Sequence, residues 1–189
     1  MGPAVADLDA VPSDRVSRWK LASRVLVPSF MVRLYYGFRH RTLVSPRAEV
    51  DWSSETEWGP GCVISAFVKI KIGGPFTMGE SVQIGAGCFI AAGRAGLHIG
   101  DHVLIGPNCT VLTGNYRYDR LDVPLVQQGT TGKGVRIGRY TWVGANSVVL
   151  DGSEVGENVI IGAGSVVSGR VPANSIVQGS PAKVIFTRR

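Results

Sequence analysis

The stretch that decides the fold is residues 137–169, IGRYTWVGANSVVLDGSEVGENVIIGAGSVVSG. An aliphatic residue recurs at every sixth position, and glycine usually follows it. These positions are Ile137, Val143, Val149, Val155, Ile161 and Val167. A period of six does not match a helical turn, but it is a multiple of the two-residue alternation of a strand. We therefore expect short strands separated by turns, with every sixth side chain facing inward.

Three such units close a triangular coil of about 18 residues, and coils stack at the strand spacing of about 4.8 Å. Related runs occur at residues 72–91 and 99–111, and a ragged one at 44–70. The phase breaks between Ile70 and Ile72 and again within 92–98. Residues 44–112 and 135–180 together supply about six coils, so the expected fold is an all-β parallel β-helix.

The composition limits the classes of partner and compartment. The 189 residues carry a net charge of +6, which favours an anionic partner such as a phosphorylated cofactor, a membrane surface or a nucleic acid. No aromatic-basic recognition motif is present, so we expect no nucleic acid. The cysteines, Cys62, Cys88 and Cys109, are odd in number and lack CxxC spacing, which indicates reduced thiols and a cytoplasmic protein. We see no signal peptide and no membrane-spanning run.

The N-terminal residues precede the repeat and are expected to cap it. We predict a flexible tail over 1–12 and a helical cap over 13–43, with Ser13 as N-cap and a break at Pro28. An open end of a repeat array needs such a cap. Two interpretations of this aromatic and basic segment stay open. Packing on the column is favoured over contact with an anionic membrane.

Two other segments depart from the repeat. Residues 113–134, TGNYRYDRLDVPLVQQGTTGKG, form a long polar insertion, which inside a regular array is usually functional. We expect an extruded loop there, and a tolerated surface insertion is the alternative. Residues 181–189 are expected to form a C-terminal tail after the repeat ends near residue 180.

Several motifs resemble those of hexapeptide-repeat acyltransferases. They are the segment from Ile137 to Ser147, the segment IGAGSVV from Ile161, the run VPAN from Val171, and the ending GSPAKV from Gly179. The resemblance is greatest to the maltose and galactoside, xenobiotic and capsule or colanic-acid O-acetyltransferases. It covers about residues 44–189.

The resemblance implies a left-handed column, a homotrimer, and sites between neighbouring columns. It also implies acetyl-CoA or another acyl-CoA as co-substrate and no metal. Backbone amides at Ala145 and Ala163 would hold the pantetheine arm, and Trp142 would line the groove. Lys183 and Arg188, or Arg189, would meet the coenzyme phosphates, as cations should. A subunit-interface role for Trp142 and a solvated tail for the terminal arginines stay open.

The family's catalytic motif resembles Asn-His-Arg-Phe-Asp, and the matching stretch is Asn115-Tyr116-Arg117-Tyr118-Asp119. Tyr116 therefore stands where the resemblance implies a histidine base. A phenol titrates near 10 and an imidazole near 6.5, so ionising Tyr116 costs about 5 kcal/mol more at a given pH. A nearby cation such as Arg117 would have to lower that pKa. Otherwise Tyr116 orients the acceptor.

The remaining candidate bases lie nearby in the sequence. His98 precedes Tyr116 by three sixfold units, which is one full coil, so a regular stack would place it directly below Tyr116 as a relocated base; an exposed turn residue is the alternative. Asn115 and Asp119 flank Tyr116, and Asp119 or Asp122 can serve an amine that is already partly neutral. No histidine triplet with zinc spacing occurs, which argues against a metal site.

These observations favour acyl-CoA-dependent transfer of an acyl group, most simply acetyl, to a hydroxyl or amine of a small acceptor such as a sugar or natural-product intermediate. Two alternatives stay open. One is a related enzyme with chemistry that does not use histidine, and the other is a catalytically inactive scaffold trimer.

Overall fold

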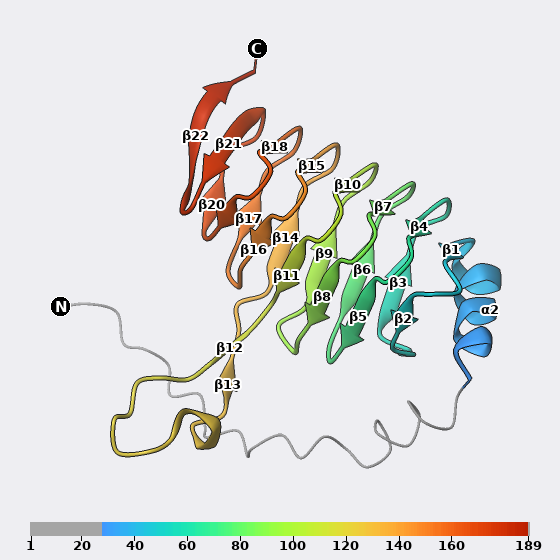
Figure 1. Ribbon diagram of the computed structural model, residues 1–189, viewed down its shortest axis with the longest axis horizontal. Helices are drawn as coiled ribbons and strands as arrows, with labels where there is room; N and C mark the ends of the chain where they lie inside the picture. The colour runs from blue at the N-terminus through green and yellow to red at the C-terminus, as the bar shows by residue number, and fades with distance from the viewer. Residues whose placement is uncertain (1–27, 189) are drawn as a thin grey trace.

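The computed structural model describes residues 28–188 and shows a column of stacked coils (Figure 1). Each coil contributes one strand to each of three parallel sheets, which we name faces A, B and C. This arrangement confirms the predicted left-handed parallel β-helix of hexapeptide repeats, with an N-terminal helix at one end.

The strands of the three faces follow one another in chain order. Face A contains β1 (Leu43–Val44), β4 (Val63–Ile64), β7 (Gln83–Ile84), β10 (Leu104–Ile105), β15 (Trp142–Val143), β18 (Ile160–Ile161), β21 (Ser175–Gly179) and β22 (Ala182–Thr187). Face B contains β2 (Glu49–Val50), β5 (Lys69–Ile72), β8 (Phe89–Ala92), β11 (Thr110–Leu112), β16 (Val148–Val149) and β19 (Val166–Val167). Face C contains β3 (Thr56–Trp58), β6 (Phe76–Met78), β9 (Leu97–Ile99), β14 (Val135–Ile137), β17 (Glu154–Val155) and β20 (Arg170–Val171).

The coil length differs between the two halves of the column. In the C-terminal half Trp142 pairs with Ile160, so the coil spans the expected three sixfold units. In the N-terminal half Val63 pairs with Gln83, so the coil there is longer by two residues. The four-residue strands β5 and β8 account for the phase breaks seen in the sequence, because Ile70 and Ile72 both point inward at the strand's two-residue period.

The sixfold aliphatics fill the interior of the column. Ile137, Val143 and Ile161 are fully buried, as their spacing predicted. The glycine that follows most of these aliphatics lets the coils approach closely: a Cβ at Gly144 would lie 2.6 Å from the backbone nitrogen of Ala163. Burying these side chains removes apolar surface from water at about 25 cal/mol per Å², which is the main force holding the coils together.

The helix α2 (Ser29–His40) begins directly after Pro28 and lies against β1 and β2 at the first coil (Figure 1). Tyr36 stacks on Trp58 with ring centroids 4.3 Å apart, and burial raises the pKa of Tyr36 to about 12. His40 Nδ1 lies 3.0 Å from the Trp58 carbonyl oxygen. Helix α2 thus covers the open end; the expected tail at 1–12 and the first part of the cap, 13–27, lie outside the described residues.

The C-terminal segment differs from the expected tail. Residues 182–187 form β22, which runs antiparallel to β21. The turn between the two strands holds a cis peptide bond before Pro181. Because β22 pairs antiparallel with β21, the hairpin covers the strand edge of the last coil, and this end of the column is also capped. Across residues 28–188, no helix combines the length and apolar character that a bilayer crossing demands.

Candidate active site

A concavity of about 380 Å³ lies on face C beside the base of the extruded loop. Strands β6, β9, β14 and β17 form its floor, and the returning end of the loop forms one wall. Its polar side chains belong to Thr77, His98, Lys133, Arg136, Ser153 and Glu154. The site therefore combines one imidazole with cations and a carboxylate on neighbouring coils.

His98 is the titratable group best placed in this concavity to accept a proton. Its Nδ1 lies 2.7 Å from the Oγ1 of Thr77, which is in register with it one coil below. Desolvation by burial lowers the pKa of His98 from its ordinary value of 6.5, and the charge of Arg136 lowers it further. Both effects favour the neutral imidazole, which is the form a general base requires.

The structure corrects the expected stacking of His98 and Tyr116. The register partner above His98 is Arg136, because β14 follows β9 on face C. Tyr116 instead lies in β12 (Asn115–Tyr116), which pairs with β13 (Thr130–Thr131) within the loop. The prediction that about 18 residues separate stacked positions was wrong here, because the chain leaves the column after Thr113, before it completes that coil.

The two ends of the loop are held at the corner between faces B and C. At the exit, the hydroxyl of Thr113 accepts a hydrogen bond from the Gly93 N–H at 2.6 Å. At the return, the carboxylate of Asp151 accepts from the N–H groups of Lys133 and Gly134, at 2.8 and 2.9 Å. These contacts fix the loop base beside the concavity, where Lys133 lines the wall.

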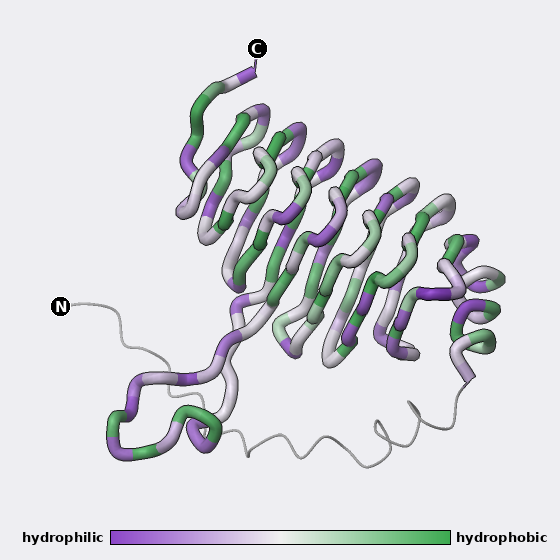
Figure 2. The backbone as a smooth tube through the Cα atoms, viewed as in Figure 1, coloured by the Kyte–Doolittle hydropathy of each residue, from purple (hydrophilic) through white to green (hydrophobic). Residues whose placement is uncertain are grey.

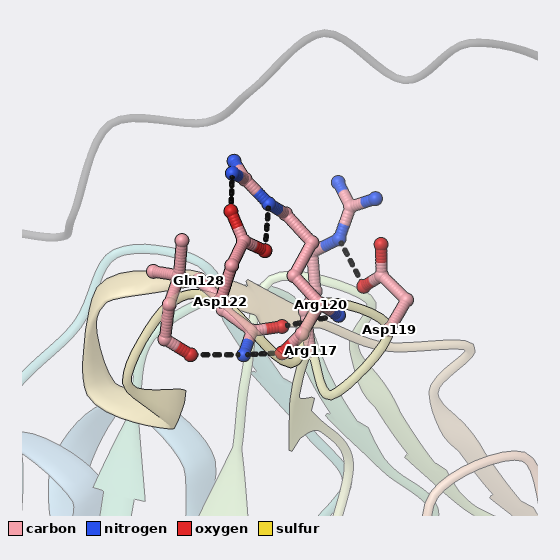
Figure 3. A network of polar contacts seen from close by, with 6 residues as sticks. Arg117, Asp119, Arg120, Asp122 and Gln128 are labelled. Carbon is pink, nitrogen blue, oxygen red and sulfur yellow. Dashed lines mark hydrogen bonds and ion pairs between the residues drawn. The ribbon is translucent and has the colours of Figure 1, made fainter.

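The body of the loop is exposed, and Figure 3 shows its ion pairs. Arg117 pairs with Asp119, and Arg120 pairs with Asp122. Gln128, which follows the short helix η1 (Leu125–Gln127), donates to the carbonyl oxygens of Arg120 and Val123 and so braces the turn. The loop is therefore an ordered hairpin that projects from the column (Figure 1).

The loop residues predicted to be catalytic are exposed and lie outside the residues that line the concavity. Tyr116 is 57% exposed, and Asn115 is exposed beside it. The hydrogen bond from Arg117 lowers the pKa of Asp119, and the one from Arg120 lowers the pKa of Asp122. A carboxylate with a lowered pKa holds a proton less readily. The structure therefore does not bring Tyr116, Asn115 or Asp119 into the concavity with His98.

The predicted coenzyme residues lie elsewhere on the column, around the corner between faces A and B. Ala145 and Ala163 occupy equivalent positions in successive coils, joined by a hydrogen bond from the Gly164 N–H to the Ala145 carbonyl oxygen. Within residues 28–188, their own N–H groups have no acceptor. Trp142 lies outward on face A and is 50% exposed. The A–B corner therefore offers two backbone N–H donors, one above the other, to a ligand.

The two predicted phosphate-binding cations lie at opposite ends of β22. Lys183 is in register with Gln178, close to the end of β21 that reaches the A–B corner. Arg188 lies past the other end, where its guanidinium donates to the Asn158 carbonyl oxygen at 3.3 Å. The strand that separates them is about 17 Å long. Lys183 therefore aligns with Ala145 and Ala163, whereas Arg188 does not.

Several site residues were missed by the sequence reasoning. Thr77, Arg136 and Glu154 share the outward row of face C with His98, and Asp151 holds the loop base. The sequence could have indicated Thr77, because its spacing from His98 equals the length of one of the longer coils of the N-terminal half. The loop lies in the sequence between His98 and Arg136, so the sixfold period does not reveal that these two residues are in register.

A family model described as bacterial transferase hexapeptide (six repeats) matches residues 134–169. A probable acetyltransferase of Mycobacterium tuberculosis is 30% identical over 91% of this chain. The chain spans 62% of that relative's length. A galactoside O-acetyltransferase of Lactococcus lactis is 28% identical, over 92% of this chain and 80% of the relative.

Solved structures share the fold. An N-acyltransferase from Bacillus cereus, in complex with dTDP and coenzyme A, superposes with a TM-score of 0.71 at 19% identity, over 82% of this chain and 88% of that one. A maltose O-acetyltransferase from Clostridium difficile gives a TM-score of 0.55 at 25% identity, over 78% of this chain and 67% of that one. Residues 134–169 thus match the bacterial transferase hexapeptide family, and the whole column shares the fold of these solved acyltransferases.

Proposed function

We propose that the protein transfers an acyl group from an acyl-CoA to a hydroxyl or amine of a small, sugar-type acceptor. The names of its relatives support the reaction class, since they include galactoside and maltose O-acetyltransferases and an N-acyltransferase in complex with dTDP-4-amino-4,6-dideoxyglucose and coenzyme A. The observation that carries the proposal is the position of His98, whose Nδ1 lies 2.7 Å from the Thr77 hydroxyl in a concavity at the base of the loop.

His98 serves as the general base. With its Nδ1–H donated to the Thr77 hydroxyl, its Nε2 keeps a lone pair for the proton of the acceptor. The acceptor oxygen or nitrogen then bonds to the thioester carbonyl carbon, the C–S bond breaks, and the thiolate leaves and takes up a proton. Lys133 and Arg136 lie in the same concavity and supply positive charge for the oxyanion that develops on the carbonyl.

The chain's own residues fit the co-substrate at the A–B corner. The free N–H groups of Ala145 and Ala163 can donate to the amide carbonyls of a pantetheine arm, and Lys183 supplies a cation at the same edge for a phosphate. Arg188 lies at the far end of β22, where it donates to the Asn158 carbonyl oxygen, so its contact with a coenzyme phosphate stays a prediction.

The geometry supports a site that is shared between chains. In a three-sided column the A–B corner is opposite face C, so a thioester held at Ala163 cannot reach His98 of the same chain. A neighbouring column must place its A–B corner against face C. We therefore propose a homotrimer whose sites each take His98 from one chain and the coenzyme edge from the next. Trp142, exposed on face A, lies beside that edge and lines the groove.

A mass-spectrometric screen of acetyl-CoA consumption against hydroxyl- and amine-bearing sugars tests the function. Turnover that is lost in His98→Gln and kept in Tyr116→Phe supports this mechanism. Turnover that survives His98→Gln would favour chemistry that does not use histidine. Failure to retain any CoA thioester at millimolar concentration would favour an inactive scaffold.

A further inference from the structure

Helix α2 is apolar on two opposite sides. Its inner side, with Val32 and Tyr36, is buried against the first coil. Its outer side carries four large apolar side chains that are half-exposed or more, and Phe38 is 83% exposed. They are Phe30, Met31, Leu34 and Phe38. Figure 2 shows hydrophobic and hydrophilic turns alternating along this helix at the end of the column.

The outer side chains form one continuous stripe. Phe30, Leu34 and Phe38 recur every four residues, so they lie above one another on the helix, and Met31 lies beside them. Trp52 extends the apolar surface past Tyr35, whose ring centroid lies 6.2 Å from that of Trp52. We name these five exposed residues, Phe30, Met31, Leu34, Phe38 and Trp52, the α2 surface. Among residues 28–188, nothing covers it.

The charged side chains on helix α2 and directly after it are all positive. Arg33 and Arg39 flank the stripe, and Arg41 follows the helix. Within residues 28–188, none of these three arginines makes an ion pair. The sequence has no aspartate or glutamate between Asp14 and Glu49, although this stretch contains eight arginines and lysines. A helix whose apolar stripe is flanked by arginines complements a surface that is anionic outside and apolar beneath.

We propose that the α2 surface docks on an anionic lipid membrane. The 12-residue helix is too short to cross a bilayer, so it lies in the plane of the interface with Phe30, Leu34 and Phe38 in the headgroup and acyl boundary. Trp52 fits the same level, because indole rings favour that boundary. The arginines contact lipid phosphates. This contact is independent of the proposed acyl transfer, since the concavity lies on face C.

Sedimentation of the full-length protein with lipid vesicles tests the proposal. We expect binding to phosphatidylcholine vesicles that contain phosphatidylglycerol, weakened by added salt, and little binding to phosphatidylcholine alone. Phe38→Glu should lower the partition coefficient by about tenfold or more. The change removes an aromatic ring that would insert into the lipid, and it adds a negative charge that anionic headgroups repel. Phe38 is so exposed that this change leaves the fold intact, which circular dichroism will verify.

Leu121→Glu is the matched control. It makes the same change in charge at a side chain that is fully exposed in the loop, away from α2, and it should bind vesicles as the wild type does. Equal loss in Leu121→Glu and Phe38→Glu would overturn the proposal by showing a general charge effect. Absence of vesicle binding would also overturn it. If no vesicle binding were seen and Phe38→Glu lowered the molecular mass measured by light scattering, the α2 surface would bind a second copy of the chain instead of a membrane.

Discussion

The Nδ1 atom of His98 lies 2.7 Å from the Oγ1 atom of Thr77, its register partner in the coil below. The hydrogen bond fixes the imidazole plane and leaves Nε2 directed away from Thr77. Partial burial and the neighbouring Arg136 both lower the pKa of His98, which favours the neutral ring. This pair explains how the protein can hold a base although the loop position carries Tyr116.

Replacing His98 should remove most of the activity. His98→Gln keeps a side chain of similar size but cannot accept the proton, and we expect kcat/KM to fall by about 10²–10⁴-fold. Steady-state kinetics with acetyl-CoA and a responsive acceptor measures this. The matched control is His102→Gln, at an exposed corner beside Glu80, which should retain near wild-type kinetics. Equal losses in both variants would contradict the assignment.

Thr77 should act as a positioning residue. Thr77→Val removes the hydroxyl that holds Nδ1, and we expect kcat to fall by about tenfold or more with a smaller change in KM, because the misoriented base acts mainly in the transition state. Thr77→Ser keeps the hydroxyl and should restore the rate. If Thr77→Ser were as impaired as Thr77→Val, packing of the methyl group would be the cause instead.

The pH profile should report the lowered pKa of His98. Because burial and Arg136 lower this pKa below 6.5, the acid limb of kcat/KM should have its midpoint below that value. Removing the cation with Arg136→Met raises the pKa, so the limb should move to higher pH. Arg136→Lys keeps the charge and should leave it in place. A limb that stays fixed in Arg136→Met would contradict the proposed electrostatic effect.

The loop base should depend on Asp151. Asp151→Ala leaves the N–H groups of Lys133 and Gly134 without their acceptor, and the loss should be about 1–3 kcal/mol of unfolding free energy or of local loop stability. Limited proteolysis within residues 113–134 and urea denaturation distinguish the two. Asp119→Ala serves as the control, because it removes an exposed ion pair worth little to stability.

Much of the fold could be predicted because one physical constraint repeats. One inward position in each sixfold unit of the regular coils holds an aliphatic side chain, so Ile137, Val149 and Ile161 reveal the column directly. The longer coils of the N-terminal half are harder to predict, since a strand lengthened by two residues keeps its alternation and only shifts the phase. Strand β22 escaped prediction because it pairs antiparallel and carries exposed Val184 and Ile185, outside the sixfold pattern.

The candidate site was less predictable because it depends on register across the inserted loop. A constant coil length wrongly placed Tyr116 above His98, where the structure has Arg136. The loop's ion pairs, which hold Asp119 to Arg117, also arise from a local fold that no period specifies. By contrast, Ala145 and Ala163 fall where the repeat places them, since no insertion separates their coils.

The central claim is that each site joins His98 of one chain to the coenzyme edge of its neighbour, and mixing two inactive variants tests it most directly. His98→Gln removes the base, and Ala163→Glu blocks the exposed edge where a pantetheine arm would lie. After the two are unfolded and refolded together in equal amounts, about a quarter of the interfaces should pair an intact His98 with an intact Ala163. We predict that activity returns to about that fraction of wild type. Mixed oligomers that form but stay inactive would show that no site is shared between chains.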